Sequence, residues 1–354
     1  MLEEVIEKIN SGRRLDRDDA LALFQSDDIF TLGEVAAQKA RDRYGDRVFY
    51  TRNRHVNPTN VCVNRCRFCA FSRSKGQDDA YTMSVEEVIH KLVSVKSSFT
   101  EVHIVGGLHP DLPFSFYLDL LSAIKSAFPG VHIKAFTAVE IDYFSKISGL
   151  GIEDTLVALK KSGLDALPGG GAEIFSPSVR QILCPDKISA SRWLAIHGIA
   201  HSTGLKTNAT MLYGHVESYE DRVDHLFMLR EQQAATGGFQ AFIPLAFQPL
   251  NSDIKGKFPS GIDDLKTIAI SRLVLDNFPH IKAYWIMLGE KITQASLFFG
   301  ADDVDGTVVE EKIAHSAGAD SKEMLTVEEM EHLIRKAGKT PVERDCFYAE
   351  IRRN

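Results

Sequence analysis

The sequence predicts an α/β fold: a closed, TIM-type (β/α)8 barrel with an N-terminal helical extension and a short C-terminal extension. From about residue 50 onward, short strand-like runs alternate with amphipathic helical segments. Successive units lie about 30 residues apart, as in the right-handed crossovers of a parallel sheet. Eight such units fit within about 250 residues, the usual length of this barrel. An open barrel of six units is the alternative, because the fourth and eighth strands are weakly marked.

The first 50 residues are expected to form helices that pack against the barrel. Apolar residues within 2–9 recur at helical spacing, and Asp16 resembles the N-cap of a second helix. A third helical segment covers about 32–44, and nothing in this region indicates chemistry. The expected organisation is an N-terminal helical extension over 1–50, a barrel over 51–310 and a C-terminal helical extension over 311–354.

The barrel elements are expected in regular order. Between the first two strands, Ser84 and Glu87 form a capping box for a helix whose apolar face covers Val85–Val95. Thr326 with Glu329 forms a second capping box near the C-terminus. The expected strands are 54–59, 101–105, 132–137, 166–167, 207–212, 239–247, 281–287 and 307–309. The expected helices cover about 85–95, 113–127, 152–161, 190–203, 219–233, 262–276 and 326–336.

Composition excludes several classes of partner. The chain has 354 residues, 44% hydrophobic and 25% charged, as in ordinary soluble globular proteins. A net charge of −7 argues against a broad nucleic-acid surface, which needs a basic face. No apolar run approaches the length of a membrane span, and the acidic start MLEEVIEKIN is unlike a signal peptide. Neither nucleic acid nor a membrane is therefore an expected partner.

Three of the five cysteines, Cys62, Cys66 and Cys69, lie within eight residues in a C-x3-C-x2-C spacing. Soft thiolates select zinc, copper(I) or iron–sulfur clusters. Structural zinc sites and [4Fe–4S] clusters normally take four ligands, but Cys184 and Cys346 stand far away in the sequence. Two interpretations follow: zinc with a distant fourth ligand such as Cys184 or a histidine, or a four-iron cluster with one iron open to substrate. Either way, the clustering indicates metal binding in a reducing compartment, the cytoplasm.

The spacing, with Phe68 directly before the last cysteine, is identified as the signature of the radical S-adenosylmethionine (SAM) superfamily. The resemblance implies a [4Fe–4S] cluster held by Cys62, Cys66 and Cys69. Its open iron would chelate the amino and carboxylate groups of SAM, and the reduced cluster would cleave SAM to methionine and a 5′-deoxyadenosyl radical. The resemblance also implies a low-potential electron donor such as flavodoxin or ferredoxin.

Polar groups that follow strands are the candidates for chemistry, because barrel enzymes carry their sites at the carboxyl ends of strands. Gly106 and Gly107 follow the second strand and would let the backbone approach a ligand closely. The family has such a pair, which holds the methionine amino group of SAM. Thr137 and Glu140 follow the third strand and could bond the ribose, although Glu140 could equally cap the next helix.

The fourth unit contains a run of three glycines followed by Glu173. The run lacks the lysine pattern of a P-loop. By resemblance to related barrel enzymes, Glu173 matches a carboxylate that binds the ribose. Arg192, nineteen residues later, matches an arginine that pairs with the SAM carboxylate, a task suited to its forked donors. The alternative for Arg192 is an ordinary charge on a surface helix.

The resemblance extends beyond the cysteines. The stretches 53–62 and 68–73 are similar to a subgroup that acts on aromatic or purine-bearing substrates, containing the futalosine-route menaquinone enzymes and the halves of deazaflavin (F0) synthase. The stretch 168–175, with Arg180, Lys187 and Trp193, most resembles the aminofutalosine synthase branch. That branch implies a transferase in menaquinone biosynthesis, in which the adenosyl radical adds to 3-[(1-carboxyvinyl)oxy]benzoate, a small aromatic dicarboxylate. Aryl migration and loss of carbon dioxide then give 6-amino-6-deoxyfutalosine, and SAM is consumed.

Three other functions remain as alternatives: cyclic dehypoxanthine futalosine synthase, an F0 synthase subunit, and a non-catalytic metal-binding protein. The first two would use the radical to abstract hydrogen. The candidates for binding the substrate carboxylates are Arg54, His109, Lys206 and His215. His103, His132 and His280 lie within strand cores and are interpreted as packing residues. Further residues that could line the pocket are Asn208, Tyr213, Glu217, Gln248, Asn251 and Trp285.

Overall fold

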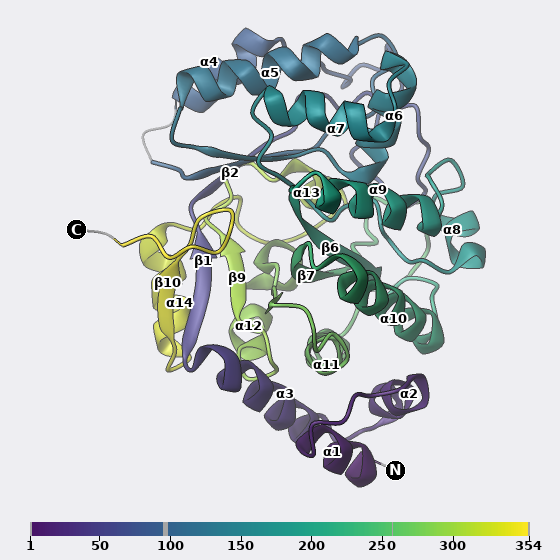
Figure 1. The fold of residues 1–354 in the computed structure, drawn as a ribbon, viewed down its shortest axis with the longest axis vertical. Coiled ribbons are helices and arrows are strands. Elements are labelled where there is room, and N and C mark those ends of the chain that lie inside the picture. Colours follow the sequence, from purple (N-terminus) through teal and green to yellow (C-terminus); the bar gives the residue numbers. More distant parts are fainter. Residues whose placement is uncertain (1, 95–97, 257, 353–354) are drawn as a thin grey trace.

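The computed structural model describes residues 2–94, 98–256 and 258–352. Its centre is a parallel sheet in which each strand pairs with the strand before it, surrounded by helices (Figure 1). This order confirms the wound α/β fold that the sequence predicts. The strands of this sheet are β2 (Asn53–Val56), β3 (Glu101–Ile104), β4 (His132–Ala135), β5 (Ala166–Leu167), β6 (Lys206–Tyr213), β7 (Phe239–Ala246) and β8 (His280–Ile281).

A second, three-stranded sheet closes the ring. It pairs β1 (Arg47–Thr51) with β9 (Asp303–Gly306) and β10 (Thr340–Glu343). β1 leads directly into β2, and the β9 segment bridges from β8 back to this first strand. Ala283 N–H donates to the Asp303 carbonyl at 2.8 Å, and Thr307 N–H donates to the Thr51 carbonyl at 3.1 Å. The β9 segment therefore occupies the eighth position of a closed barrel, a few residues before the strand expected at 307–309.

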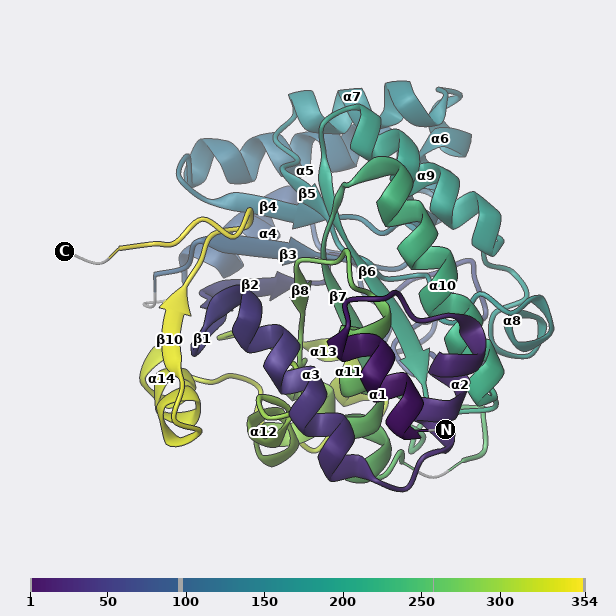
Figure 2. The same cartoon turned by 60° about the horizontal axis from the view of Figure 1, so that its bottom comes forward.

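The helices pack around the strands, as Figures 1 and 2 show. Both predicted capping boxes, at Ser84 with Glu87 and at Thr326 with Glu329, are present. Val95, expected at the end of an apolar face, lies outside the described residues. The helices that follow β2 are α4 (Val85–Val93), α5 (Phe114–Ala127), α6 (Ala138–Ser148), α7 (Ile152–Lys161), α8 (Pro177–Leu183), α9 (Ala190–Ser202), α10 (Tyr219–Thr236), α11 (Gly261–Val274), α12 (Trp285–Ser296), α13 (Lys312–Ser316) and α14 (Val327–Lys336).

The strand expected over 281–287 is wrong beyond Ile281. Trp285 is the first residue of α12, and its indole N–H donates to the Gly306 carbonyl at 2.8 Å. A short apolar run that is buried on all sides has the same composition in a strand and in a buried helix. Periodicity therefore could not separate the two here.

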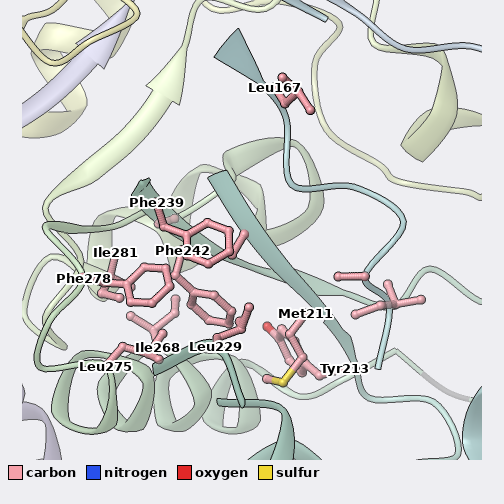
Figure 3. Close-up of a cluster of buried hydrophobic side chains, with 14 of the residues drawn as sticks. Leu167, Met211, Tyr213, Leu229, Phe239, Phe242, Ile268, Leu275, Phe278 and Ile281 are labelled. Atoms are coloured by element: carbon pink, nitrogen blue, oxygen red, sulfur yellow. The ribbon is translucent and has the colours of Figure 1, made fainter. Parts of the chain in front are cut away.

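The outer faces of β6, β7 and β8 pack against α10 and α11 through a cluster of large apolar side chains (Figure 3). Phe239 and Phe278 stack with their ring centroids 5.3 Å apart, and both rings are buried. Because this apolar layer binds helices to the outside of the sheet, the inward-facing positions of the same strands are free to carry polar groups.

Of the N-terminal helices, α2 (Arg17–Gln25) packs against α10 and α11, α3 (Ile29–Tyr44) packs against α11, and α1 (Leu2–Asn10) packs against α2. Phe24 stacks on Tyr219 with ring centroids 5.0 Å apart, and Lys266 donates to the Ser26 carbonyl at 2.7 Å. These contacts hold the N-terminal helices against the outer helices of the barrel. None of the described helices is both long and apolar enough to cross a membrane.

The C-terminal segment is not purely helical, contrary to the expectation for 311–354. It includes β10, which pairs with β1, and a tail that covers the barrel end where the strands begin. Gln240, near the start of β7, donates to the Cys346 carbonyl at 3.1 Å, and Tyr348 stacks on His280 with centroids 3.7 Å apart. The pairing of β1 with β10 joins residues almost 300 positions apart, which no local pattern reveals.

Candidate active site

The carboxyl ends of the strands open into a cavity of about 300 Å³. Its wall contains Cys62, Cys66 and Cys69 from the loop after β2, together with Phe68. Of the predicted cofactor residues, Gly106, Gly107, Thr137, Glu140 and Glu173 also line it. The fold therefore brings these nine candidate site residues from four strand ends to one cavity. This cavity lies at the carboxyl ends of the strands, where barrel enzymes carry their active sites.

The cysteine loop is held by backbone hydrogen bonds to three separate segments. Cys62 N–H donates to the Arg73 carbonyl at 3.0 Å, Val63 N–H to the Leu108 carbonyl at 3.0 Å, and Arg67 N–H to the Leu183 carbonyl at 2.8 Å. These bonds fix the loop against the second and fourth units of the barrel.

The donor set of the loop fits an iron–sulfur cluster. All three thiols are free and partly exposed, whereas Cys184 is buried and does not line the cavity. Burial raises the pKa of Cys66 to about 12, so its thiolate needs a cationic partner such as iron. Within the described chain, no three His, Cys, Asp or Glu side chains gather as a site for a single metal ion.

Gly107 is required by the cysteine loop itself. A Cβ atom on Gly107 would lie 2.1 Å from the Val61 carbonyl oxygen, which is backbone and cannot swing away. On Gly106 the nearest atom would be the Thr59 carbonyl oxygen at 3.3 Å. The second glycine thus lets the strand end approach the loop that carries the cysteines, in addition to any role toward SAM.

We expect Gly107→Ala to displace the cysteine loop and to lose most of the iron that the wild-type protein takes up on anaerobic reconstitution. The overpacking should also cost about 1–3 kcal/mol of stability. Gly106→Ala is the matched control, because its Cβ needs a shift of only a few tenths of an ångström. Iron content and melting temperature measure both effects. Equal iron content in the two variants would contradict the close-approach argument.

Glu140 caps α6 and also faces the cavity. Its carboxylate accepts hydrogen bonds from Thr137 N–H at 2.7 Å and from Gly106 N–H at 3.1 Å. Thr137 completes the capping box by accepting from Glu140 N–H at 3.3 Å. The capping interpretation of Glu140 is therefore confirmed, and its carboxylate also ties two strand ends together at the cavity wall, whereas a bond to the ribose stays a prediction. Burial raises its pKa to about 7, although these backbone donors lower it.

The raised pKa of Glu140 predicts a pH dependence of stability. Between pH 4.5 and about 7 the folded state holds a proton that the unfolded state releases, so stability falls as pH rises through this window. The contribution is at most about 3 kcal/mol. In the metal-free protein, Glu140→Gln should flatten the decline of melting temperature between pH 5 and 8. Glu153→Gln, at an exposed position, should follow wild type; parallel curves for all three proteins would refute the assignment.

Glu173 and Lys187 form an ion pair in the cavity wall. Lys187 Nζ lies 2.5 Å from a Glu173 carboxylate oxygen and 5.1 Å above the Phe68 ring. Burial lowers the pKa of Lys187, but the nearby Cys66 and Glu173 outweigh it, so the ammonium stays charged. Glu173 itself has a left-handed backbone, with φ of 49°. The Lys187 ammonium is therefore a positive charge beside the thiols of the cysteine loop.

Arg192 lies outside the cavity wall. Its Nε donates to Asp142 at 2.7 Å, and 46% of its side chain is exposed. Arg192 therefore lies on a surface helix, as in the alternative interpretation of this residue. Arg180 is the buried arginine of this region, and it donates to the carbonyls of Ala172 and Ile174, bracing the glycine-rich loop.

None of the four candidates for the substrate carboxylates lines the cavity. Lys206 begins β6 at the opposite barrel end and donates to the Gly237 carbonyl. His215 lies 2.8 Å from Glu217, and His109 accepts from Asp111 N–H. Arg54 sits over the Phe99 ring, on the outer side of β2. Adjacent residues of a strand point to opposite faces. Because Arg54 points outward, its neighbour His55 is the residue that faces the barrel interior.

The inward-facing residues below the mouth are instead His55, His103, Lys134, Asn208 and Lys282, which we call the cavity floor. The packing interpretation of His103 was therefore wrong. Asn208 and Gln248 line the cavity as expected, whereas Tyr213, Glu217, Asn251 and Trp285 do not. Strand alternation around Arg54 is the one sequence signal that pointed to His55.

Two buried ion pairs set the electrostatics of the cavity floor. Lys134 lies 2.9 Å from Glu101, and Lys282 lies 2.6 Å from Asp305. Burial alone raises the pKa of Glu101, but Lys134 and other cations lower it to about 2. The two histidines stay neutral, because burial lowers their pKa values to about 4 for His55 and about 3 for His103.

Comparison with known proteins defines the class. Residues 56–229 match the model of the radical SAM superfamily, and residues 236–353 match that of the CofH/MqnC C-terminal region. The chain belongs to the radical SAM superfamily. Membership implies a [4Fe–4S] cluster bound by cysteines, and SAM.

Within the superfamily, the chain is most usefully compared with three relatives and one solved structure. The chain is 46% identical to the aminodeoxyfutalosine synthase of Thermus thermophilus, over 98% of this chain and 95% of the relative. It is 46% identical to that of Streptomyces coelicolor, over 99% and 94%. It is 41% identical to the 5-amino-6-(D-ribitylamino)uracil–L-tyrosine 4-hydroxyphenyl transferase of Methanococcoides burtonii, over 99% of both chains. The crystal structure of methylornithine synthase shares the fold, with a TM-score of 0.76 and 18% identity over 95% and 97%.

Proposed function

We propose that the protein is an aminodeoxyfutalosine synthase, which joins the adenosyl group of SAM to 3-[(1-carboxyvinyl)oxy]benzoate with loss of carbon dioxide. The observation that carries the proposal is the 46% identity, over nearly the whole length, to two enzymes of that name. The cavity supports it, because one space contains three thiols at its mouth and polar groups at its floor.

The residues of the cavity wall have distinct roles in this proposal. Cys62, Cys66 and Cys69 would hold the cluster, which with bound SAM supplies the 5′-deoxyadenosyl radical. Lys187 offsets negative charge beside Cys66. Glu173, which lines the cavity, would accept hydrogen bonds from the ribose hydroxyls. The barrel interior limits the access of water to the reacting centre.

The backbone at Gly106 and Gly107 is the proposed contact for the methionine part of SAM. Both glycines line the cavity beside the cysteine loop. Thr137 and Glu140 hold this strand end in place through their capping box. We infer that the enzyme works in the cytoplasm and receives its electron from flavodoxin or ferredoxin, since cluster reduction needs a low-potential donor.

The test is an anaerobic assay of the reconstituted protein with SAM and dithionite. One reaction receives the enolpyruvyl benzoate, and a second receives L-tyrosine with 5-amino-6-(D-ribitylamino)uracil, the substrates named for the 41% identical relative. An adenosyl adduct that has lost carbon dioxide, found by mass spectrometry in the first reaction alone, supports the proposal. A product only in the second would replace it with the transferase activity. Release of 5′-deoxyadenosine without any adduct would favour a hydrogen-abstracting relative.

A further inference from the structure

Neighbouring strands set three polar side chains of the cavity floor side by side. His55, His103 and Lys134 are register partners across β2, β3 and β4, and all three line the cavity. The rings of the two histidines are 4.6 Å apart. His55 is the last residue but one of β2, so the row lies just below the loop that carries Cys62. Barrel interiors at this level are usually packed with branched apolar residues, so a polar row here needs a ligand or a partner.

The cavity floor contains more hydrogen-bond donors than its own residues use. An ammonium group has three donors. Within the described residues, Lys134 hydrogen-bonds to Glu101 alone and Lys282 to Asp305 alone. The Asn208 amide oxygen is buried without a partner, and an amide can present either its oxygen or its nitrogen to a ligand. These groups converge from β4, β6 and β8 on the same space.

The two lysines of the cavity floor are held in place by ion pairs. Lys134 pairs with Glu101 and Lys282 with Asp305, and both carboxylates also line the cavity, so what the floor offers a ligand is its unused donors and not an excess of positive charge. A carboxylate is the ligand that can accept from several converging donors at once, through about four lone-pair sites. Hydrogen bonds in which the donor or the acceptor is charged are the strong kind.

We propose that the cavity floor binds the ring carboxylate of an aromatic substrate. The inference rests on the proposed function and adds to it the orientation of the substrate within the cavity. The alkene must meet the adenosyl carbon near the cysteines, and its own carboxylate is attached to the alkene, so that carboxylate stays near the mouth. The ring carboxylate lies across a rigid benzene ring and therefore reaches the floor. A tyrosine would present a neutral phenol at this position, so the floor distinguishes the two substrate classes.

The test compares the substrate with its ring carboxamide. Dissociation constants of both compounds are measured by anaerobic equilibrium dialysis on the reconstituted enzyme. Wild type should bind the acid about 10- to 100-fold more tightly than the amide, as expected for hydrogen bonds to a charged group. His103→Leu and Lys282→Met should each reduce this ratio severalfold. His132→Asn is the control, because His132 belongs to β4 but does not line the cavity, and its ratio should equal that of wild type.

The acid-to-amide ratio of dissociation constants separates recognition of the carboxylate from structural damage, because misfolding would weaken the binding of both compounds together. Melting temperature and SAM cleavage without substrate check each variant, and His55→Asn replaces any variant that fails to fold. An unchanged acid-to-amide ratio in all floor variants, in an enzyme that still forms the adduct, would overturn the inference alone. No adduct formation by wild type would overturn the proposed function instead.

Discussion

Replacing Cys66 with serine is expected to abolish the reductive cleavage of SAM, with 5′-deoxyadenosine production reduced at least about 1,000-fold. Cys66 lies in the cavity wall between Cys62 and Cys69, and a hydroxyl is a poor substitute for a soft thiolate on iron. With three protein ligands only, the loss of one leaves the cluster without a stable attachment. Iron and sulfide content, the visible absorption of the reconstituted protein and 5′-deoxyadenosine by chromatography are the measurements.

Cys184→Ser is the matched control for this experiment. Cys184 is buried near the same loop but does not line the cavity, so its variant should keep its iron and its SAM cleavage. Loss of iron in Cys184→Ser, matching that in Cys66→Ser, would support the alternative in which Cys184 is a fourth ligand. Normal turnover by Cys66→Ser would contradict the role of the cysteine loop altogether.

The cysteine loop was predictable because its information is local. Three cysteines within eight residues, followed by Gly106 and Gly107 at the next strand end, indicate a site before the fold is known. The regular alternation of strands and helices then specifies where that site lies, because parallel strands all end at one face of a barrel. Glu173 reaches the cavity for the same reason.

Apart from Asn208, the cavity floor was not predictable in this way. Whether Arg54 or His55 faces the interior depends on the phase of a four-residue strand, and both faces of that strand are buried. The usual contrast between polar and apolar positions is then missing. His103 and Lys134 become neighbours of His55 only through the register of two strand pairings, which the sequence does not display.

The barrel end opposite the site depends on contacts still more distant in sequence. Arg344 follows β10 and donates through Nε to Asp303 of β9 at 2.7 Å, and neither side chain is exposed. Its guanidinium also lies 4.2 Å from the centroid of the Tyr348 ring. Asp303 is next but one to Asp305, the partner of Lys282, so this pair supports the cavity floor from below.

Replacing Arg344 with methionine is therefore expected to destabilise the protein by about 3–5 kcal/mol, because it leaves the Asp303 carboxylate buried without its main partner. Lys282, 3.9 Å from Asp303 and already bonded to Asp305, compensates only in part. Anaerobic urea denaturation measures the loss. The control is Arg335→Met, since Arg335 is exposed and its partner Glu331 in α14 keeps a hydrogen bond from Tyr50, so this change should cost less than about 1 kcal/mol. Adding Asp303→Asn to Arg344→Met should recover part of the loss, because the uncompensated charge is then gone. If Arg344→Met cost no more than Arg335→Met, the tail would not be an essential part of the barrel floor.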